Sequence, residues 1–200
     1  MNQTFDERAA TWDDDPKKVE RARVAAESVR SLVELRSDMR VLEYGAGTGL
    51  LSQQLVDEIG PLTLADPSEG MRAVLAQKVD GGMFPGGQVS DLDLSQRVPE
   101  DRFDLVISLM ALHHIPDLPP VLAGFAEILD AGGTFCAIDL EQEDGSFHKP
   151  GFDGHNGFDR DELAQLLSDA GFGPTTFEHC FDLDKNDRTY GLFAAVARRP

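Results

Sequence analysis

Short apolar runs alternate with stretches of helical spacing along most of this chain. Runs rich in Val, Leu, Ile and Phe are typical of buried strands, whereas apolar residues three or four positions apart are typical of helices. The predicted strands are residues 41–44, 61–66, 88–90, 103–110, 134–140, 175–183 and 190–197. Predicted helices lie between the earlier strands, and the last two strands form a hairpin. This order predicts an α/β fold with a doubly wound, mostly parallel sheet and helices on both faces.

Capping residues mark several predicted helix ends. Asp15 is an N-cap candidate for the first long helix, because Pro16 follows it at the first helical position. Ser68 and Asp159 are N-cap candidates for two later helices. The helix that opens near Pro119 is expected to close at the pair Gly132-Gly133.

The most informative stretch is the sequence GAGTG at residues 45–49, which separates a predicted strand from a predicted helix. Glycine adopts positive φ without strain and leaves no Cβ between the backbone and a ligand. The start of the helix offers unpaired N–H groups and a partial positive charge. A tight turn without a ligand would also fit this pattern, but the residues around it favour a binding loop.

Two classes of ligand use such a turn. A dinucleotide-binding loop reads G-x-G-x-x-G, with its pyrophosphate at the helix N-terminus. In this chain Leu50 stands at the last position of that pattern, and the third glycine comes one residue early. Glu43, two residues before the first glycine, would repel a pyrophosphate but attract a cationic amino group. The turn therefore favours a cationic ligand.

The stretch E-Y-G-A-G-T-G resembles the E/D-x-G-x-G-x-G motif of class I S-adenosylmethionine-dependent methyltransferases. The resemblance extends from about Trp12 onward and is strongest between residues 41 and 133. It implies the strand order 3-2-1-4-5-7-6, with strand 7 antiparallel, and S-adenosylmethionine as cofactor. It also implies a single Rossmann-like domain over residues 1–200, with an N-terminal helical cap at about residues 1–37.

The resemblance also implies roles for individual residues. Glu43 would face the amino group of the cofactor, and residues 45–49 would surround its methionine part. Asp66 would accept both ribose hydroxyls, and the residues that follow Asp66 would touch the adenine. Asp91 would lie near the adenine amino group, with the nearby Asp93 as the alternative. The complete predicted cofactor-binding set is Glu43, Gly45, Ala46, Gly47, Thr48, Gly49, Asp66, Pro67, Met71, Asp91, Leu92, Ser108 and Leu109.

Histidines gather where the loops of the predicted sheet meet. His113 and His114 follow the fourth strand, and His148 and His155 lie on the long link at residues 141–158. Ligands of open α/β sheets bind at this edge. We expect His113 to be the catalytic residue, through proton transfer or substrate contact. We also hypothesise that the link, which carries three phenylalanines, covers the acceptor pocket; packing of these rings in the core is the alternative.

Composition narrows the class of substrate. The 200 residues carry a formal net charge of −18, and the sequence pI is about 4.5. Such a field repels nucleic acid and anionic membranes, so neither is an expected partner. Cys136 and Cys180 fit no metal-ligand spacing, and we expect no metal and no disulfide. The N-terminus lacks the features of a signal peptide, so a cytoplasmic location is expected.

Methyl transfer to an O, N or C atom of a small-molecule acceptor is the predicted function. No N/D-P-P-Y sequence follows the fourth strand, which disfavours methylation of DNA bases. The chain resembles the small-molecule branch related to quinone-biosynthesis methyltransferases, but the acceptor and the oligomeric state are not indicated. A non-catalytic S-adenosylmethionine-binding protein and, less favoured, an NAD-dependent oxidoreductase stay open.

Overall fold

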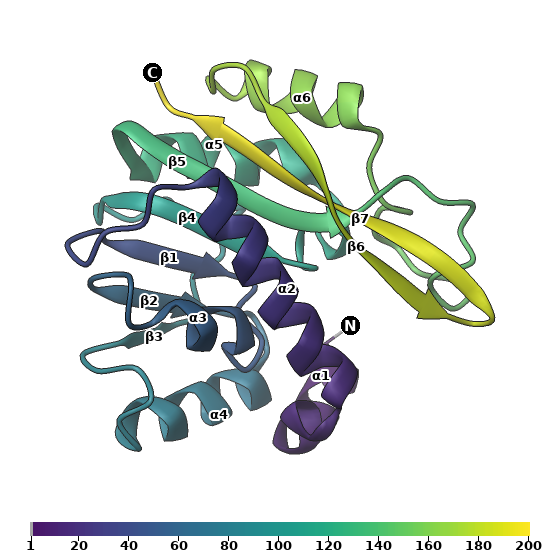
Figure 1. The fold of residues 1–200 in the computed structure, drawn as a ribbon, viewed down its shortest axis with the longest axis horizontal. Helices are drawn as coiled ribbons and strands as arrows, with labels where there is room; N and C mark the ends of the chain where they lie inside the picture. The colour runs from purple at the N-terminus through teal and green to yellow at the C-terminus, as the bar shows by residue number, and fades with distance from the viewer. Residues whose placement is uncertain (1) are drawn as a thin grey trace.

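The structure, a computed structural model, describes residues 2–200, and these form a seven-stranded sheet. The strands lie in the order β3-β2-β1-β4-β5-β7-β6 (Figure 1). Strands β1 to β5 pair in parallel, whereas β7 is antiparallel to β5 and β6. The predicted order and the antiparallel seventh strand are confirmed. The bounds are β1 Val41–Tyr44, β2 Leu62–Ala65, β3 Gln88–Ser90, β4 Phe103–Leu109, β5 Leu129–Leu140, β6 Thr176–Lys185 and β7 Arg188–Arg198.

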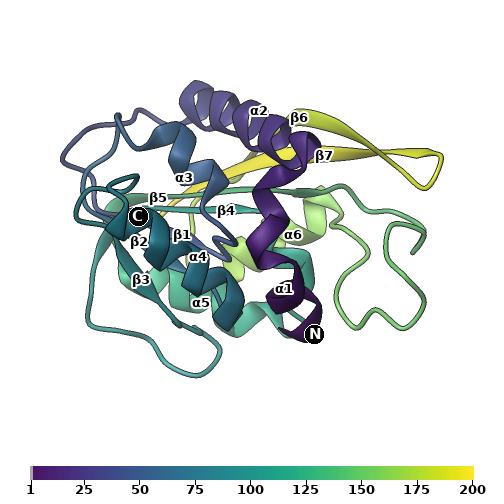
Figure 2. The same cartoon turned by 90° about the horizontal axis from the view of Figure 1, so that it is seen from below.

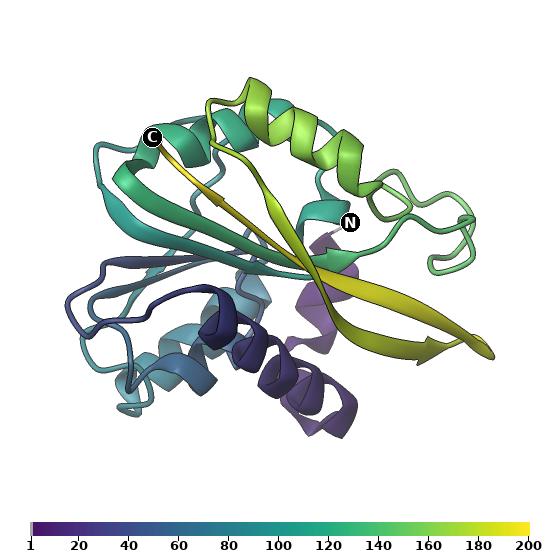
Figure 3. The same ribbon diagram turned by 45° about the horizontal axis from the view of Figure 1, so that its top comes forward.

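Helices cover both faces of the sheet, as predicted (Figure 3). One face packs against α2 (Pro16–Leu32), α3 (Leu50–Leu55) and α4 (Glu69–Asp80). The opposite face packs against α5 (Leu118–Ile128) and α6 (Arg160–Asp169). The short segments α1 (Asn2–Arg8) and η1 (Ala9–Asp14) precede α2, and η2 (Leu112–His114) follows β4. Within residues 2–200, none of these helices has the length and apolarity needed to cross a membrane.

The predicted N-caps are confirmed. The Asp15 carboxylate accepts the Lys17 N–H at 3.0 Å, and the Ser68 hydroxyl accepts the Met71 N–H at 3.1 Å. Asp159 accepts two N–H groups in the first turn of α6. Each of these side chains satisfies a backbone donor that the helix itself leaves free.

The helix after β4 is shorter than predicted. We expected it to end at Gly132-Gly133, but α5 ends at Ile128 and β5 begins at Leu129. Leu129 pairs with Phe103 of β4, and the register then shifts before the regular ladder begins. The two glycines lie in this irregular part of β5, where Gly132 has a φ of 80°. Strand pairing thus outweighs the helical periodicity of the local sequence.

The β6–β7 hairpin extends beyond the rest of the sheet, on the same side as the link at residues 141–158 (Figure 2). Its turn residues Asn186 and Asp187 have φ values of 54° and 58°, as in a two-residue type I′ turn. Arg188 bonds to Asp144 at 2.7 Å, and the Asn186 amide bonds to the Ser146 carbonyl at 3.1 Å. The hairpin is therefore fastened to the link.

Strand β7 also separates the two cysteines, which lie on β5 and β6. Both thiols are free, as expected.

The N-terminal segment is held against the start of α4. The Asp6 carboxylate accepts the Ser68 hydroxyl at 2.5 Å and the Gly70 N–H at 2.9 Å. A Cβ on Gly70 would lie 2.7 Å from the Asp6 Cα, which is closer than real Cβ contacts. Glycine at position 70 therefore lets α1 approach.

We predict that Gly70→Ala displaces α1 without unfolding the sheet. Hydrogen exchange should accelerate at residues 5–14, while the melting temperature falls by only a few degrees, because the clash is with backbone at the edge of the fold. Asp14→Ala, which removes an exposed carboxylate from the same segment, is the matched control. Unchanged exchange in Gly70→Ala would show that α1 is not held by this contact.

Candidate functional site

The glycine turn between β1 and α3 is built for close approach. Gly45, Gly47 and Gly49 have φ values of 71°, 57° and 78°. A Cβ on Gly45 would lie 2.3 Å from the Ala111 Cβ, so this glycine lets the turn touch the loop after β4. A Cβ on Gly47 would meet nothing within 4 Å. The backbone at Gly47 is therefore open on the side where a ligand can lie.

Asp66, at the end of β2, joins the two loops that the sequence assigned to the cofactor. Its Oδ2 accepts the Gly47 N–H at 2.7 Å, and its Oδ1 accepts the Ser68 N–H at 2.8 Å. The side chain is buried, and burial raises its pKa although both N–H groups oppose the rise. Each carboxylate oxygen has a further lone pair for a ligand.

Glu43 lies beneath the turn, on the α3 side of the sheet. Its Oε2 accepts the Ser52 N–H at 3.1 Å in the first turn of α3. The N-cap residue of this helix, Gly49, has no side chain to do so. Burial raises the pKa of Glu43 to about 7, and the Ser52 N–H opposes the rise. The carboxylate therefore accepts a free N–H group at the start of α3, a role that the sequence analysis did not assign.

The remaining predicted cofactor residues differ widely in exposure. Asp91 is exposed and pairs with Arg97 at 2.7 Å, while Leu92 is buried. Pro67 is exposed as well. The Asp91 carboxylate thus takes no part in the hydrogen bond between the Gly47 N–H and Asp66. The Asp91 side chain instead lines a shallow groove of about 500 Å³ between α4 and β3, together with Glu69, Arg72, Ala73, Ala76, Val89 and Ser90.

Several residues predicted to contact the cofactor are buried or half-buried at the start of α4 or the end of β4. Met71 is buried in the first turn of α4. The Ser108 hydroxyl donates to the Tyr44 carbonyl at 2.9 Å and so ties the end of β4 to the end of β1. Leu109 is half-buried at the end of β4.

The N-terminal segment also contacts the glycine turn. The Asp13 carboxylate accepts the Thr48 hydroxyl at 2.5 Å and pairs with Lys78 at 2.6 Å. The Lys78 ammonium in turn donates to the Thr48 carbonyl at 2.7 Å. Thr48, a predicted cofactor contact, is consequently buried under η1.

His113 forms a buried pair with Asp139, which lies near the end of β5. Nδ1 of the imidazole is 2.5 Å from the Asp139 Oδ1. The Asp139 carboxylate also accepts the N–H groups of Leu112, at 3.0 Å, and Leu140, at 2.7 Å. Burial opposes ionisation of Asp139, but the contact with His113 and the backbone N–H groups outweigh burial and lower the pKa of Asp139. Asp139 was missed by the sequence analysis; the only signal was an acid inside an apolar strand.

Two further histidines lie beside His113. The ring centroids of His114 and His148 are 4.2 Å and 5.1 Å from that of His113. Burial is the largest cause that lowers the pKa of His114 to about 3 and that of His148 to about 4, and a proton on His113 would lower both further. His155, the fourth predicted histidine, instead contacts the Ile115 carbonyl at 2.9 Å through its Nε2.

Aromatic rings surround this histidine group. Phe152 stacks on His148 with ring centroids 3.7 Å apart, and Phe5 meets His114 edge-on at 5.3 Å. Phe147 is buried between His148 and the hairpin, and Phe158 belongs to the core on the α5 side. Phe147 and Phe158 are both buried in the core, on the α2 side and the α5 side of the sheet respectively, so packing in the core, the alternative, holds for these two rings. Phe152 is half-buried, and that it covers an acceptor pocket stays a prediction.

The sequence and the fold resemble known proteins. The model of a family described as a methyltransferase domain matches residues 18–176. An uncharacterized methyltransferase of Schizosaccharomyces pombe is 29% identical over 152 residues, which cover 68% of this chain and 54% of that protein. The chain spans about half the length of the curated relatives it matches.

Two solved structures show the same fold. One is the methyltransferase in complex with the Trm112 methyltransferase activator of Haloferax volcanii, with a TM-score of 0.78, 21% identity, and coverage of 98% of this chain and 97% of that one. Another is a phosphoethanolamine N-methyltransferase of Haemonchus contortus in complex with phosphomonomethylethanolamine and S-adenosylhomocysteine. Its TM-score is 0.72 at 16% identity, with coverage of 86% of this chain and 51% of that one.

We predict that Glu43 makes the stability of the fold depend on pH. Its pKa is about 7 in the folded protein and 4.5 ordinarily, so the folded state holds this proton more tightly than the unfolded state. The contribution is greatest below pH 4.5 and is lost as the pH rises towards 7, by up to about 3 kcal/mol. Urea unfolding at pH 5 and pH 8 should show a larger loss in the natural protein than in Glu43→Gln.

The exposed Glu69→Gln exchange is the matched control and should lose as much stability as the natural protein. Parallel pH profiles for the natural protein and Glu43→Gln would contradict the assignment.

Proposed function

This chain belongs to the methyltransferase domain family, and from that premise we propose that it transfers the methyl group of S-adenosylmethionine to a small-molecule acceptor. The observation that carries the proposal is the buried His113–Asp139 pair beside the glycine turn. We propose that residues 1–200 act as one catalytic domain, with the N-terminal helices as its cap.

The residues at the carboxyl edge of β1 and β2 fit the cofactor. The open backbone at Gly47 suits the methionine part, and the free lone pairs of Asp66 suit the ribose hydroxyls. Glu43, whose pKa is about 7 in the folded protein, would carry a negative charge beneath the turn once ionised, and that charge would attract a cationic amino group. Asp91 and Leu92 remain the proposed neighbours of the adenine, beside the groove between α4 and β3.

His113 is the proposed catalytic residue. When bound, S-adenosylmethionine supplies an electrophilic methyl group on a sulfonium. Because Nδ1 of His113 donates to Asp139 in this reading, its Nε2 keeps a free lone pair. Nε2 is buried and without a partner among residues 2–200. Nε2 of His113 would take the proton that the acceptor's O, N or C atom loses as that atom is methylated.

The surroundings of His113 suit a compact acceptor with an apolar part. Phe152 and Phe5 line the histidine group, and Lys185 lies over the ring of Phe147 at 3.6 Å. The net charge of −18 disfavours a nucleic-acid acceptor. We propose small phenols, quinols or amines as the first acceptors to test.

Asp66→Ala should weaken S-adenosylmethionine binding by at least tenfold, since a charge-assisted hydrogen bond contributes about 1.5–3 kcal/mol. Isothermal titration measures this directly. Asp101→Ala is the matched control, because it removes an exposed carboxylate that is not among the predicted cofactor contacts. An unchanged Kd in Asp66→Ala would refute the ribose assignment.

His113→Ala should lower methyl transfer by about a hundredfold or more, with little change in cofactor affinity. The measurement is methyl release from S-adenosylmethionine across small phenols, quinols and amines. Cofactor binding without transfer to any acceptor would favour the alternative of a non-catalytic S-adenosylmethionine-binding protein. Binding of NAD in place of S-adenosylmethionine would favour the oxidoreductase.

A further inference from the structure

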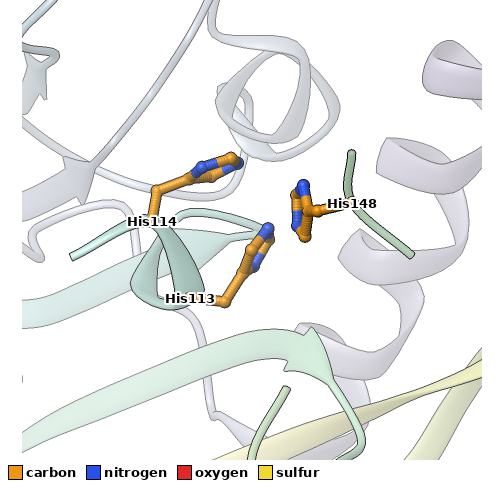
Figure 4. A group of neighbouring side chains, drawn as sticks. All are labelled: His113, His114 and His148. Carbon is orange, nitrogen blue, oxygen red and sulfur yellow. The ribbon is translucent and has the colours of Figure 1, made fainter. Parts of the chain in front are cut away.

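Three histidines from two separate segments surround one small space (Figure 4). His113 and His114 come from η2, and His148 comes from the link after β5. One ring nitrogen from each residue lies within 4.8 Å of the other two. The site is held together by the fold, because the link is bonded to η2: the His155 N–H donates to the His113 carbonyl at 2.8 Å.

Each of the three rings also has a buried nitrogen without a partner. These atoms are Nε2 of His113, Nδ1 of His114 and Nε2 of His148. None of them has a hydrogen-bond partner among residues 2–200. Buried polar atoms are nearly always hydrogen-bonded, and an unsatisfied one costs about 1–3 kcal/mol. Three such atoms on three adjacent rings indicate a common ligand for them.

We propose that His113, His114 and His148 bind one divalent transition-metal ion, with Zn²⁺ as the best match. Imidazole nitrogen is a preferred ligand of Zn²⁺, Cu²⁺ and Ni²⁺. With Zn–N bonds of about 2.0–2.1 Å, tetrahedral ligand atoms lie about 3.4 Å apart. The three nitrogens therefore have to close by about 1.4 Å at most. Rotation of the rings and a small shift of the link suffice, because His148 is on an irregular segment.

The surroundings of His113 match those of metal-binding histidines. Its Nδ1 is held by Asp139, which leaves Nε2 as the ligand atom. A carboxylate bonded to the second nitrogen of a ligating histidine fixes the tautomer and makes the ring more basic.

Lys185 is the group that opposes the ion. Its ammonium lies 3.6 Å from the centre of the Phe147 ring, whose centre is 4.8 Å from that of His148, and this positive charge would repel a metal ion. The buried carboxylate of Asp139 offsets this repulsion. Replacement of Lys185 by glutamine should consequently raise the affinity for the metal severalfold.

Three protein ligands leave a fourth tetrahedral position open, as in catalytic zinc sites. An ion there would bind an oxygen or nitrogen atom of the acceptor and would favour the deprotonated form of that atom in place of His113. This link to the acceptor rests on the proposed methyl transfer, whereas metal binding by the three histidines does not.

The test uses the full chain, stripped of metal with a chelator and titrated with Zn²⁺ or Co²⁺. Isothermal titration should show one tight equivalent. The Co²⁺ protein should absorb visible light strongly, as four- and five-coordinate Co²⁺ does, rather than weakly, as octahedral Co²⁺ does. This readout needs neither cofactor nor acceptor.

His148→Ala should lower metal affinity at least tenfold while the protein remains folded, because His148 is half-buried on the link. His179→Ala, which removes an exposed histidine of β6, is the matched control and should bind as the natural protein does. Asp139→Asn should lower affinity about 10- to 100-fold.

Equal metal binding by the natural protein and His148→Ala, or an octahedral Co²⁺ spectrum in the natural protein, would overturn the proposal. Either result would place the bound metal on the many surface carboxylates. Cofactor titration on the same samples keeps the two proposals distinct. S-adenosylmethionine binding and methyl release by metal-free protein would support the proposed function whether or not the histidines bind a metal.

Discussion

Three carboxylates lie buried at the carboxyl edge of the parallel sheet, and their need for hydrogen-bond donors organises the loops there. A buried carboxylate is tolerated only when donors surround it. Glu43 bonds to the start of α3, Asp66 to the glycine turn and to the start of α4, and Asp139 to η2. Each acid thereby holds a loop or the start of a helix at the carboxyl edge of the sheet. The residues of the proposed site are positioned by these bonds.

Much of this arrangement could be predicted from local sequence. Apolar periodicity predicts the strands and the GAGTG turn between strand and helix, whereas the strand order follows from a resemblance carried by a few residues. Tertiary contacts decided the rest. The role of Asp139 depends on η2 reaching the end of β5, and the approach of His148 depends on how the link folds back. No spacing in the chain joins residues 113, 114 and 148, which is why no metal was expected.

Negative charge predominates in the chain as a whole, with a net charge of −18, whereas positively charged side chains lie near the histidine group. Burial lowers the pKa of Arg21, whose Nε lies buried without a partner among residues 2–200, and Lys185 lies over Phe147. The net negative charge repels polyanions. Lys185 is the last residue of β6, so the β6–β7 hairpin brings this cation to the neighbourhood of the histidine group.

The N-terminal segment touches both loops that carry the proposed cofactor contacts. Asp6 holds the loop of Ser68 and Gly70, and Asp13 holds the glycine turn through Thr48. Docking of the N-terminal segment and binding of a ligand to these loops are therefore linked. The free energy that the docked segment contributes to ligand binding equals the free energy that the bound ligand contributes to docking of the segment. A domain or label fused to the N-terminal segment that hinders its docking would therefore weaken ligand binding at the two loops. Ligand binding would in turn favour the docked position of the segment by the same coupling free energy.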